Sequence, residues 1–338
     1  MRAVRVVEPG SIDGLRFVEA AEPALGRSDV RIRVRAASLN FRDLLIARGL
    51  YPGPLKHQPI PLSDGAGEVI AVGEDVSRVA LGDRVVVSCF PRWIAGPMIE
   101  EYHAAAVGMT IDGLLSETAM YDESAFLKIP EHLSYEQAAA MPCAAVSAWS
   151  AMNVHEPLRA GQTVLVQGTG GVALFALQLA RAQGAKVLAI TSSPERAALL
   201  RDMGAAEVVD YNRNPDWHLE ILALTDGRGV DKVVEIGGEK TIQKAVACTR
   251  LGGELGLVGF VTGFGGGLPP TDIMNRSVML RGISIGPRQN FETLLAVMET
   301  ANLRPKIGET FGFADFASAY HYMADGKHVG KIVIDLAT

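Results

Sequence analysis

Two patterns of hydrophobic and polar positions divide the chain. In the N-terminal third, short apolar or alternating runs at 30–36, 67–72 and 84–87 are separated by turn-forming clusters, a pattern typical of β-strands. From Gln162 onward, apolar strands alternate with amphipathic helices, which predicts βαβ units and a parallel sheet. The pattern therefore indicates an α/β protein with a mostly β domain and a doubly wound domain.

The expected elements of the second pattern follow one another at regular spacing. We predict strands at 163–167, 186–191, 207–210, 231–236 and 254–259, helices at 172–183, 194–203, 240–249 and 290–301, and a last strand at 331–336.

The uncharged stretch 137–154 approaches the length of a membrane span, but it contains Pro142, Gln137 and Asn153. We interpret that stretch as a buried helix and expect no membrane partner.

Length and composition narrow the class of protein. A chain of 338 residues with 48% hydrophobic and 21% charged residues is expected to form two globular domains. The net charge of −6 is mild and the basic residues are scattered, so we expect no nucleic-acid partner. The first eight residues lack the apolar core of a signal peptide, and the three cysteines lie too far apart for a disulfide framework. We expect a cytoplasmic protein.

A glycine-rich turn follows the first strand of the second pattern. Gly168, Gly170 and Ala173 have the Gly-x-Gly-x-x-Gly/Ala spacing between a strand and a helix. With 36 glycines in the chain, about one such match is expected by chance, so the strand and helix context carries the inference. We predict that Gly168, Gly170, Gly171 and Val172 bind a dinucleotide pyrophosphate. The alternative is a glycine turn that binds nothing.

The residues after the second strand favour one nicotinamide cofactor. NAD sites carry an acidic residue about 20 positions after the turn, and this chain has none there. Ser192, Ser193 and Arg196 instead offer hydroxyl groups and a cation that suit a 2′-phosphate, so we expect NADP(H). The alternative is that the two serines, with Pro194, only cap the next helix while Arg196 is solvated.

Six further segments, together with the glycine turn, are similar to motifs of one protein family. They lie at 37–43, 65–69, 82–85, 141–149, 203–205 and 330–333. Together they resemble the medium-chain dehydrogenase/reductase superfamily, and within it the zinc-free quinone oxidoreductase-like branch. The resemblance implies a GroES-like β catalytic domain (1–126 and 287–338), a Rossmann domain with a doubly wound parallel sheet (127–286), and an active-site cleft where they meet. It also implies a homodimer formed through the outer sheet edge at 280–285.

The ligands of a catalytic zinc are largely replaced. Zinc-dependent members of the superfamily carry a Cys, a His-Glu pair and a later Cys. At the matching positions this chain has Asn40, then Ser63 and Asp64, and only Cys143 remains. An amide and a hydroxyl are poor zinc ligands beside a single thiolate, so we expect no metal. We interpret Cys143 as a small buried residue rather than a nucleophile.

The expected reaction is hydride transfer to a small activated carbonyl acceptor: a quinone, a 2-alkenal or an enone. Such an addition builds negative charge on oxygen, which positioned hydrogen-bond donors can stabilise without a metal. Asn40 and Tyr51 are the candidate catalytic donors, because the resemblance places both beside the nicotinamide. Alternatively, Tyr51 packs on Pro52, and Asn40 braces its loop while Asp43 caps locally. The aromatic stretch 90–103 is either a substrate lid or a packed surface loop.

The resemblance also assigns residues to the cofactor. It implies that Ser147 lies beside the nicotinamide, Tyr211 on the adenosine side and Arg288 near the phosphates, and we add Gly237 as a cofactor-binding residue. Helix back-bonding by Ser147 and surface solvation of Tyr211 and Arg288 are the alternatives. Two other functions stay open: an alcohol dehydrogenase of the zinc type, and a nicotinamide-binding protein with little turnover.

Overall fold

The computed structural model describes residues 1–153 and 155–337 and divides the chain into two compact units. The first unit comprises residues 1–144 and 286–338, and the second comprises Ala145–Ile285. The expected boundary at 126/127 therefore needs correction. Residues 127–144 belong to the first unit because α3 (Tyr135–Ala139) packs against its strands β3, β4 and β5.

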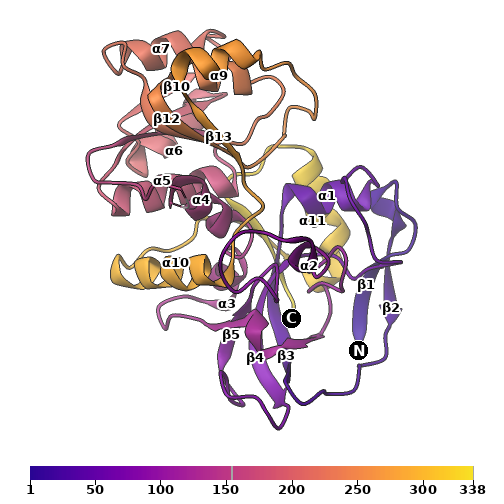
Figure 1. The fold of residues 1–338 in the computed structure, drawn as a ribbon. Helices are drawn as coiled ribbons and strands as arrows, with labels where there is room; N and C mark the ends of the chain where they lie inside the picture. Colours follow the sequence, from indigo (N-terminus) through magenta and orange to yellow (C-terminus); the bar gives the residue numbers. More distant parts are fainter. Residues whose placement is uncertain (154, 338) are drawn as a thin grey trace. The chain divides into compact units, whose positions relative to one another are not determined.

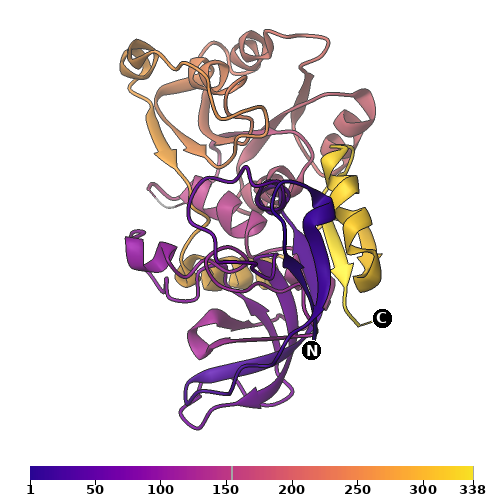
Figure 2. The same ribbon diagram turned by 90° about the vertical axis from the view of Figure 1, so that its right-hand side faces the viewer.

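The first unit is built on a mostly antiparallel sheet with the strand order β14-β15-β3-β4-β5-β7, in which β6 also pairs with β3. β15 from the C-terminus lies antiparallel to β3, so both ends of the chain are needed to complete this unit (Figure 2). A separate hairpin joins β1 and β2. The bounds are β1 Arg2–Val6, β2 Leu15–Glu19, β3 Asp29–Leu39, β4 Asp64–Val72, β5 Arg84–Val87, β6 Thr118–Asp122, β7 Phe126–Lys128, β14 Ile307–Gly312 and β15 Lys331–Asp335.

Eight helical segments, most of them short, are described in the first unit. They are η1 Ile12–Gly14, α1 Phe41–Ala47, α2 Glu100–His103, η2 Glu123–Ala125, α3, α10 Arg288–Thr300, η3 Phe313–Asp315 and α11 Phe316–Ala324. The stretch 90–103 packs against the start of α10, because the backbone N–H groups of Arg288 and Gln289 donate to the carbonyls of Trp93 and Ile94. Trp93 is buried and stacks on Tyr102. These contacts favour the packed-loop interpretation of this stretch.

The second unit is a six-stranded, fully parallel sheet in the order β10-β9-β8-β11-β12-β13. Helices α5 and α6 pack on one face, and α7, α8 and α9 on the other (Figure 1). The bounds are α4 Ala144–Asn153, β8 Thr163–Gln167, α5 Gly171–Ala182, β9 Lys186–Thr191, α6 Pro194–Asp202, β10 Glu207–Asp210, α7 Trp217–Ala223, β11 Val230–Glu235, α8 Ile242–Ala247, β12 Thr249–Leu257, α9 Pro270–Arg276 and β13 Met279–Gly282. The strand order reverses direction between β8 and β11, which in such sheets marks the ligand-binding edge.

Burial explains why these strands form continuous apolar runs. Every residue of β8 is buried, as expected for a parallel strand covered on both faces. Leu165, Leu188, Val233 and Leu255 come from four neighbouring strands and share one core with Trp217 of α7. The core therefore fixes the sheet whose C-terminal edge carries the glycine turn.

The stretch 137–154 is not the single helix that we expected. It contains the end of α3 and the whole of α4, with a break around Pro142, since proline interrupts the helical hydrogen bonds. Position 154 lies outside the described residues. Among the described residues, no helix combines the length and the apolar character that a membrane span requires.

Candidate active site

Asn40 lies between the end of β3 and the start of α1, and it is buried. Its side-chain Oδ1 accepts a hydrogen bond of 2.6 Å from the Lys331 ammonium. Its Nδ2 group is also buried and has no partner among the described residues. Buried amide donors are normally paired, so an unpaired one needs an explanation, such as a ligand that supplies the acceptor.

Lys331 is almost fully buried at the start of β15. The register pairs Ile332 with Leu39, which brings Lys331 opposite Asn40. Besides Asn40, its Nζ atom donates to the Leu39 carbonyl at 2.8 Å and to Asp64 Oδ2 at 3.4 Å. A buried ammonium needs such partners, because an isolated charge is strongly disfavoured away from water.

Asp64, at the start of β4, is fully buried and supplies the opposite charge. It accepts hydrogen bonds from the Ser63 hydroxyl at 2.8 Å and from the Cys143 backbone N–H at 3.2 Å. The Cys89 thiol donates to the same carboxylate at 3.4 Å. Burial, together with the neighbouring Cys143 thiol and Asp64, raises the pKa of Cys89 well above its usual range, so Cys89 stays a thiol.

This donor set does not fit a catalytic zinc. The Lys331 ammonium already binds Asn40 Oδ1 and Asp64 Oδ2, two oxygens that a zinc ion at this position would need. A zinc ion bound to these oxygens at about 2 Å would lie close to a buried like charge.

A second group of charged and aromatic side chains lies next to Asn40, on and after α1. The Asp43 carboxylate accepts a 2.8 Å hydrogen bond from the Asn40 backbone N–H, which matches the local capping that we considered for Asp43. Arg42 is buried, and its guanidinium lies 5.6 Å from the centre of the Tyr51 ring. Burial raises the pKa of Tyr51, which keeps its phenol protonated and able to donate.

The Asp43 carboxyl should make the stability of the protein depend on pH. Burial raises its pKa from 3.8 to about 6. Because the folded-state pKa is the higher one, its stabilising contribution is complete below pH 3.8 and is lost as the pH rises through about 6. Between about pH 4 and 7, the unfolding free energy of the wild type should therefore fall by about 2 kcal/mol relative to the Asp43→Asn variant.

Chemical denaturation at several pH values measures this difference. The amide introduced by Asp43→Asn keeps an oxygen that can accept from the Asn40 N–H, so the variant retains the local cap. Asp325→Asn, at an exposed position after α11, is the matched control and should follow the wild-type curve. Parallel pH curves for the wild type and Asp43→Asn would contradict the prediction.

In the second unit, the glycine turn has the geometry that its spacing predicts. Gly168 follows β8 with a φ of +77°, a conformation that favours glycine, and Gly170 precedes α5 as its N-cap. A Cβ atom at Gly168 or Gly170 would meet no atom within 4 Å, so packing inside the protein does not explain either glycine. Gly171 and Val172 form the first turn of α5, where backbone N–H groups lack helical acceptors.

A buried polar network crosses the point where the strand order reverses. Gln167 ends β8 and Glu235 ends β11, and the Gln167 amide donates to Glu235. Glu235 Oε1 accepts from the backbone N–H groups of Gly237 and Gly238, both at 2.9 Å, and from the Thr241 hydroxyl. Burial raises the pKa of Glu235, while these hydrogen bonds oppose the shift. The network fixes the backbone at Gly237, and sequence reasoning missed Gln167 and Glu235.

The residues predicted to select the cofactor gather after β9 and β10. Ser193 is the N-cap of α6 and accepts from the Arg196 backbone N–H at 3.3 Å, so it performs the capping role given above as the alternative. The Tyr211 backbone donates to the Thr191 carbonyl, and the Asn212 amide donates to the Ser192 carbonyl. β9 and β10 are parallel neighbours, so the residues that follow their C-terminal ends lie at the same end of the sheet. These residues include Ser192, Ser193, Arg196 and Tyr211.

Two buried hydroxyl groups beside the turn were not predicted. The Oγ1 atoms of Thr169 and Thr191 have no hydrogen-bond partner among the described residues. Thr169 lies inside the glycine turn, and this position could have marked it as a cofactor-binding residue from the sequence. Thr191 is at the end of an apolar strand, and nothing in the sequence distinguishes it.

Two other predicted cofactor residues lie elsewhere in the fold. Ser147 is buried on α4. Arg288 belongs to the first unit, where it donates to the Ser124 carbonyl and pairs with Glu292.

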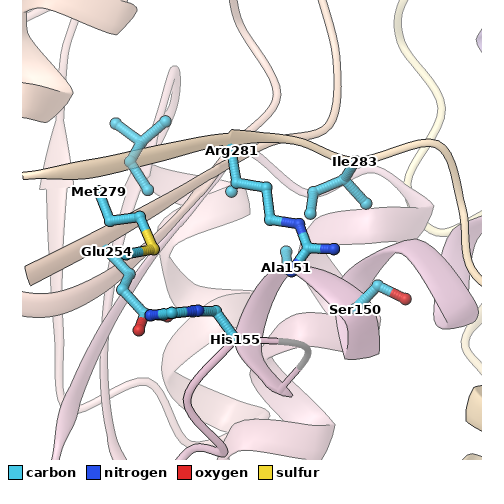
Figure 3. Close-up of a pocket in the computed structure, with 9 residues that line it drawn as sticks. Ser150, Ala151, His155, Glu254, Met279, Arg281 and Ile283 are labelled. Carbon is cyan, nitrogen blue, oxygen red and sulfur yellow. The ribbon is translucent and has the colours of Figure 1, made fainter. Parts of the chain in front are cut away.

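A small pocket in the second unit is lined in part by His155 and Glu254 (Figure 3), which belong with Glu156 to another group of possible metal ligands. His155, Glu156 and Glu254 each offer a ligand atom, and these atoms lie within 4.8 Å of one another. The buried Lys232 ammonium, however, contacts Glu254 at 2.6 Å and the Glu156 carbonyl at 2.6 Å. Because Lys232 already neutralises Glu254 and binds one of its carboxylate oxygens, we assign no metal to the group.

Comparison with known proteins identifies the family. Residues 26–131 match the alcohol dehydrogenase GroES-like domain, and residues 171–300 match the zinc-binding dehydrogenase family. A zinc-type alcohol dehydrogenase-like protein of Schizosaccharomyces pombe is 36% identical over 344 residues, which cover 99% of both chains. The chain belongs to the medium-chain dehydrogenase/reductase superfamily.

Other medium-chain dehydrogenase/reductase proteins extend the comparison. The quinone oxidoreductase of Pseudomonas aeruginosa is 30% identical over 334 residues, covering 94% of each chain. The structure of a mycobacterial protein complexed with NADPH superposes with a TM-score of 0.84 at 27% identity, covering 99% of this chain and 100% of that one. The family and the combination of a GroES-like domain with a Rossmann-like sheet are therefore confirmed. The protein is an oxidoreductase of a superfamily that binds nicotinamide cofactors.

Proposed function

We propose that this protein is a zinc-free, NADPH-dependent oxidoreductase that transfers a hydride to an activated carbonyl acceptor, namely a quinone, a 2-alkenal or an enone. The observation that carries the proposal is the Asn40 side chain. Its Nδ2 donor is buried without a partner in the part of the chain that the structure describes, while the Lys331 ammonium binds its oxygen. The similarity to a quinone oxidoreductase supports the acceptor class.

The proposed chemistry follows from where charge develops. NADPH held at the glycine turn would supply a hydride to the β-carbon of an enone or to a quinone, and negative charge would then develop on the acceptor oxygen. The Asn40 Nδ2 group donates a hydrogen bond to that oxygen as its charge grows. A proton from Tyr51, whose phenol burial keeps protonated, or from water then completes the reduced product.

A cofactor-oxidation assay tests the proposal. NADPH consumption is measured with quinones, 2-alkenals and enones, with saturated ketones as matched controls, and NADP⁺ reduction is measured with alcohols. Both assays are run before and after dialysis against a chelator, beside elemental analysis. We expect turnover of the activated acceptors, no loss after chelation and no stoichiometric zinc. Alcohol turnover that needs zinc would instead identify a zinc-type alcohol dehydrogenase. Tight NADPH binding without turnover of any compound would identify a nicotinamide-binding protein with little activity.

The preference for NADPH is also part of the proposal. Ser192, Ser193 and Arg196 follow β9, which ends at Thr191, and none of the residues 191–194 is acidic. An acidic group there would accept from the ribose hydroxyls of NADH and repel a 2′-phosphate. A guanidinium and hydroxyl groups donate hydrogen bonds to a 2′-phosphate, so they favour NADPH over NADH. The solved relative complexed with NADPH supports this choice.

Arg196→Ala should weaken binding of NADPH but not of NADH. Loss of a charge-assisted contact to the 2′-phosphate should raise the Kd for NADPH about 10-fold or more, with a change within about twofold for NADH. Fluorescence titration of both cofactors measures the two constants. Arg201→Ala, on the same helix, is the control and should leave the ratio of the constants unchanged. Equal losses for NADPH and NADH would contradict the assignment of Arg196.

A further inference from the structure

We propose that Lys331 is a positioning residue, whose ammonium holds the Asn40 carboxamide so that Nδ2 donates to the acceptor oxygen of the substrate. The inference rests on the proposed function, in which Asn40 is that donor. It assigns a role in the reaction to a residue that lies 291 positions away from Asn40 in the sequence.

The chemistry of the two groups decides how the amide is oriented. An ammonium group only donates hydrogen bonds, so the atom that contacts it at 2.6 Å is the amide oxygen and not the nitrogen. A flipped amide would bring Nδ2 against Nζ, two donors with no acceptor between them. The carboxamide is planar, and its NH2 group therefore faces away from Lys331. That NH2 group is the buried donor without a partner among the described residues.

Lys331 is itself held in place. Its three N–H groups meet three acceptors: Asn40 Oδ1, the Leu39 carbonyl at 2.8 Å and Asp64 Oδ2 at 3.4 Å. Lys331 and Asp64 begin the two strands that flank β3, and Asn40 directly follows β3. Groups on regular strands are fixed more precisely than groups on loops, so the ammonium gives Asn40 a rigid support.

The same contact strengthens the donor. A cation that binds the oxygen of an amide withdraws electron density from the group, and its N–H bonds then donate more strongly. The effect is larger in a buried environment, where water does not screen it. Asp64 keeps the pair neutral, and the Ser63 hydroxyl and the Cys143 backbone N–H hold that carboxylate. Lys331 therefore acts on the acceptor oxygen through Asn40 and without contact to the substrate.

Two variants separate the positioning role from the ion pair. Lys331→Met alone would leave a buried, unpaired Asp64 carboxylate, so the first variant is the double substitution K331M/D64N, which removes both charges together. The second variant is Lys331→Arg, which keeps a positive charge opposite Asp64 but changes the shape and position of the donors. Each is made in the wild type and in an Asn40→Ala background. Thermal unfolding and the Kd for NADPH serve as readouts of folding and of the cofactor site.

We expect K331M/D64N to lower kcat for a quinone or an enone by about 10- to 100-fold, with the Kd for NADPH within about twofold. K331R should lower kcat by a smaller factor. In the Asn40→Ala background, neither substitution should lower kcat further, because Lys331 acts only through Asn40. If K331M/D64N does not fold, the same comparison with K331R decides the question.

The outcomes distinguish this inference from the proposed function. A loss of kcat in Asn40→Ala, but none in K331M/D64N or K331R, overturns the role of Lys331 and leaves the proposed donor intact. Losses that multiply in the combined variants show that Lys331 acts independently of Asn40, and they also overturn the inference. An unchanged kcat in Asn40→Ala overturns both the inference and the proposed donor.

Discussion

Asn40→Ala is expected to lower kcat for the reduction of a quinone or an enone about 100- to 1000-fold while NADPH binds as before. This range is typical for the loss of one donor that stabilises a developing oxyanion. The donor is buried and the oxygen of the same amide is held by Lys331, so the substitution removes a positioned hydrogen bond to the acceptor oxygen. Steady-state kinetics at saturating NADPH, beside a fluorescence titration of the cofactor, measures the two effects separately.

Two further variants make this prediction specific. Asn40→Asp keeps an oxygen for Lys331 but removes the Nδ2 donor, and it should be as slow as Asn40→Ala. Asn275→Ala, at an exposed position on α9, is the matched control and should keep the wild-type kcat. A kcat within about threefold of the wild type for both Asn40 variants would exclude Asn40 as the oxyanion donor.

Gly170→Val should weaken NADPH binding about 1000-fold while the fold stays intact. A Cβ atom at Gly170 would meet no protein atom within 4 Å, so the new side chain finds space in the folded protein. That space lies at the N-terminus of α5, where the pyrophosphate is expected. The valine would hold the phosphates away from the backbone and cost two or more charge-assisted hydrogen bonds of about 1.5–3 kcal/mol each.

Gly267→Val is the matched control for this prediction. Gly267 also has open space around its Cβ position and lies in the same unit, in the loop before α9. The Gly267→Val variant should keep the Kd for NADPH within about twofold of the wild type and should leave the melting temperature nearly unchanged. If Gly170→Val unfolds the protein, or if both variants weaken NADPH binding equally, the assignment of Gly170 to the pyrophosphate is wrong.

Local patterns predicted the elements of the second unit well. The strands expected at 163–167, 186–191 and 207–210 match β8, β9 and β10, because apolar runs of this length and the turns between them depend on neighbouring residues. Ser193 and Pro194 marked the start of α6 for the same reason. The prediction of a single helix over 137–154 was wrong. The stretch is rich in helix-forming residues, but Pro142 interrupts the helical hydrogen bonds and separates α3 from α4.

The sequence by itself determined the family and the glycine turn, because these depend on residue type and short spacing. Only the tertiary structure showed that Lys331 reaches Asn40 and Asp64, and that Gln167 meets Glu235. These contacts depend on which strands are neighbours and in which register, and on burial that removes water from the charges. Strand order and register join residues far apart in the chain, so no local pattern contains them.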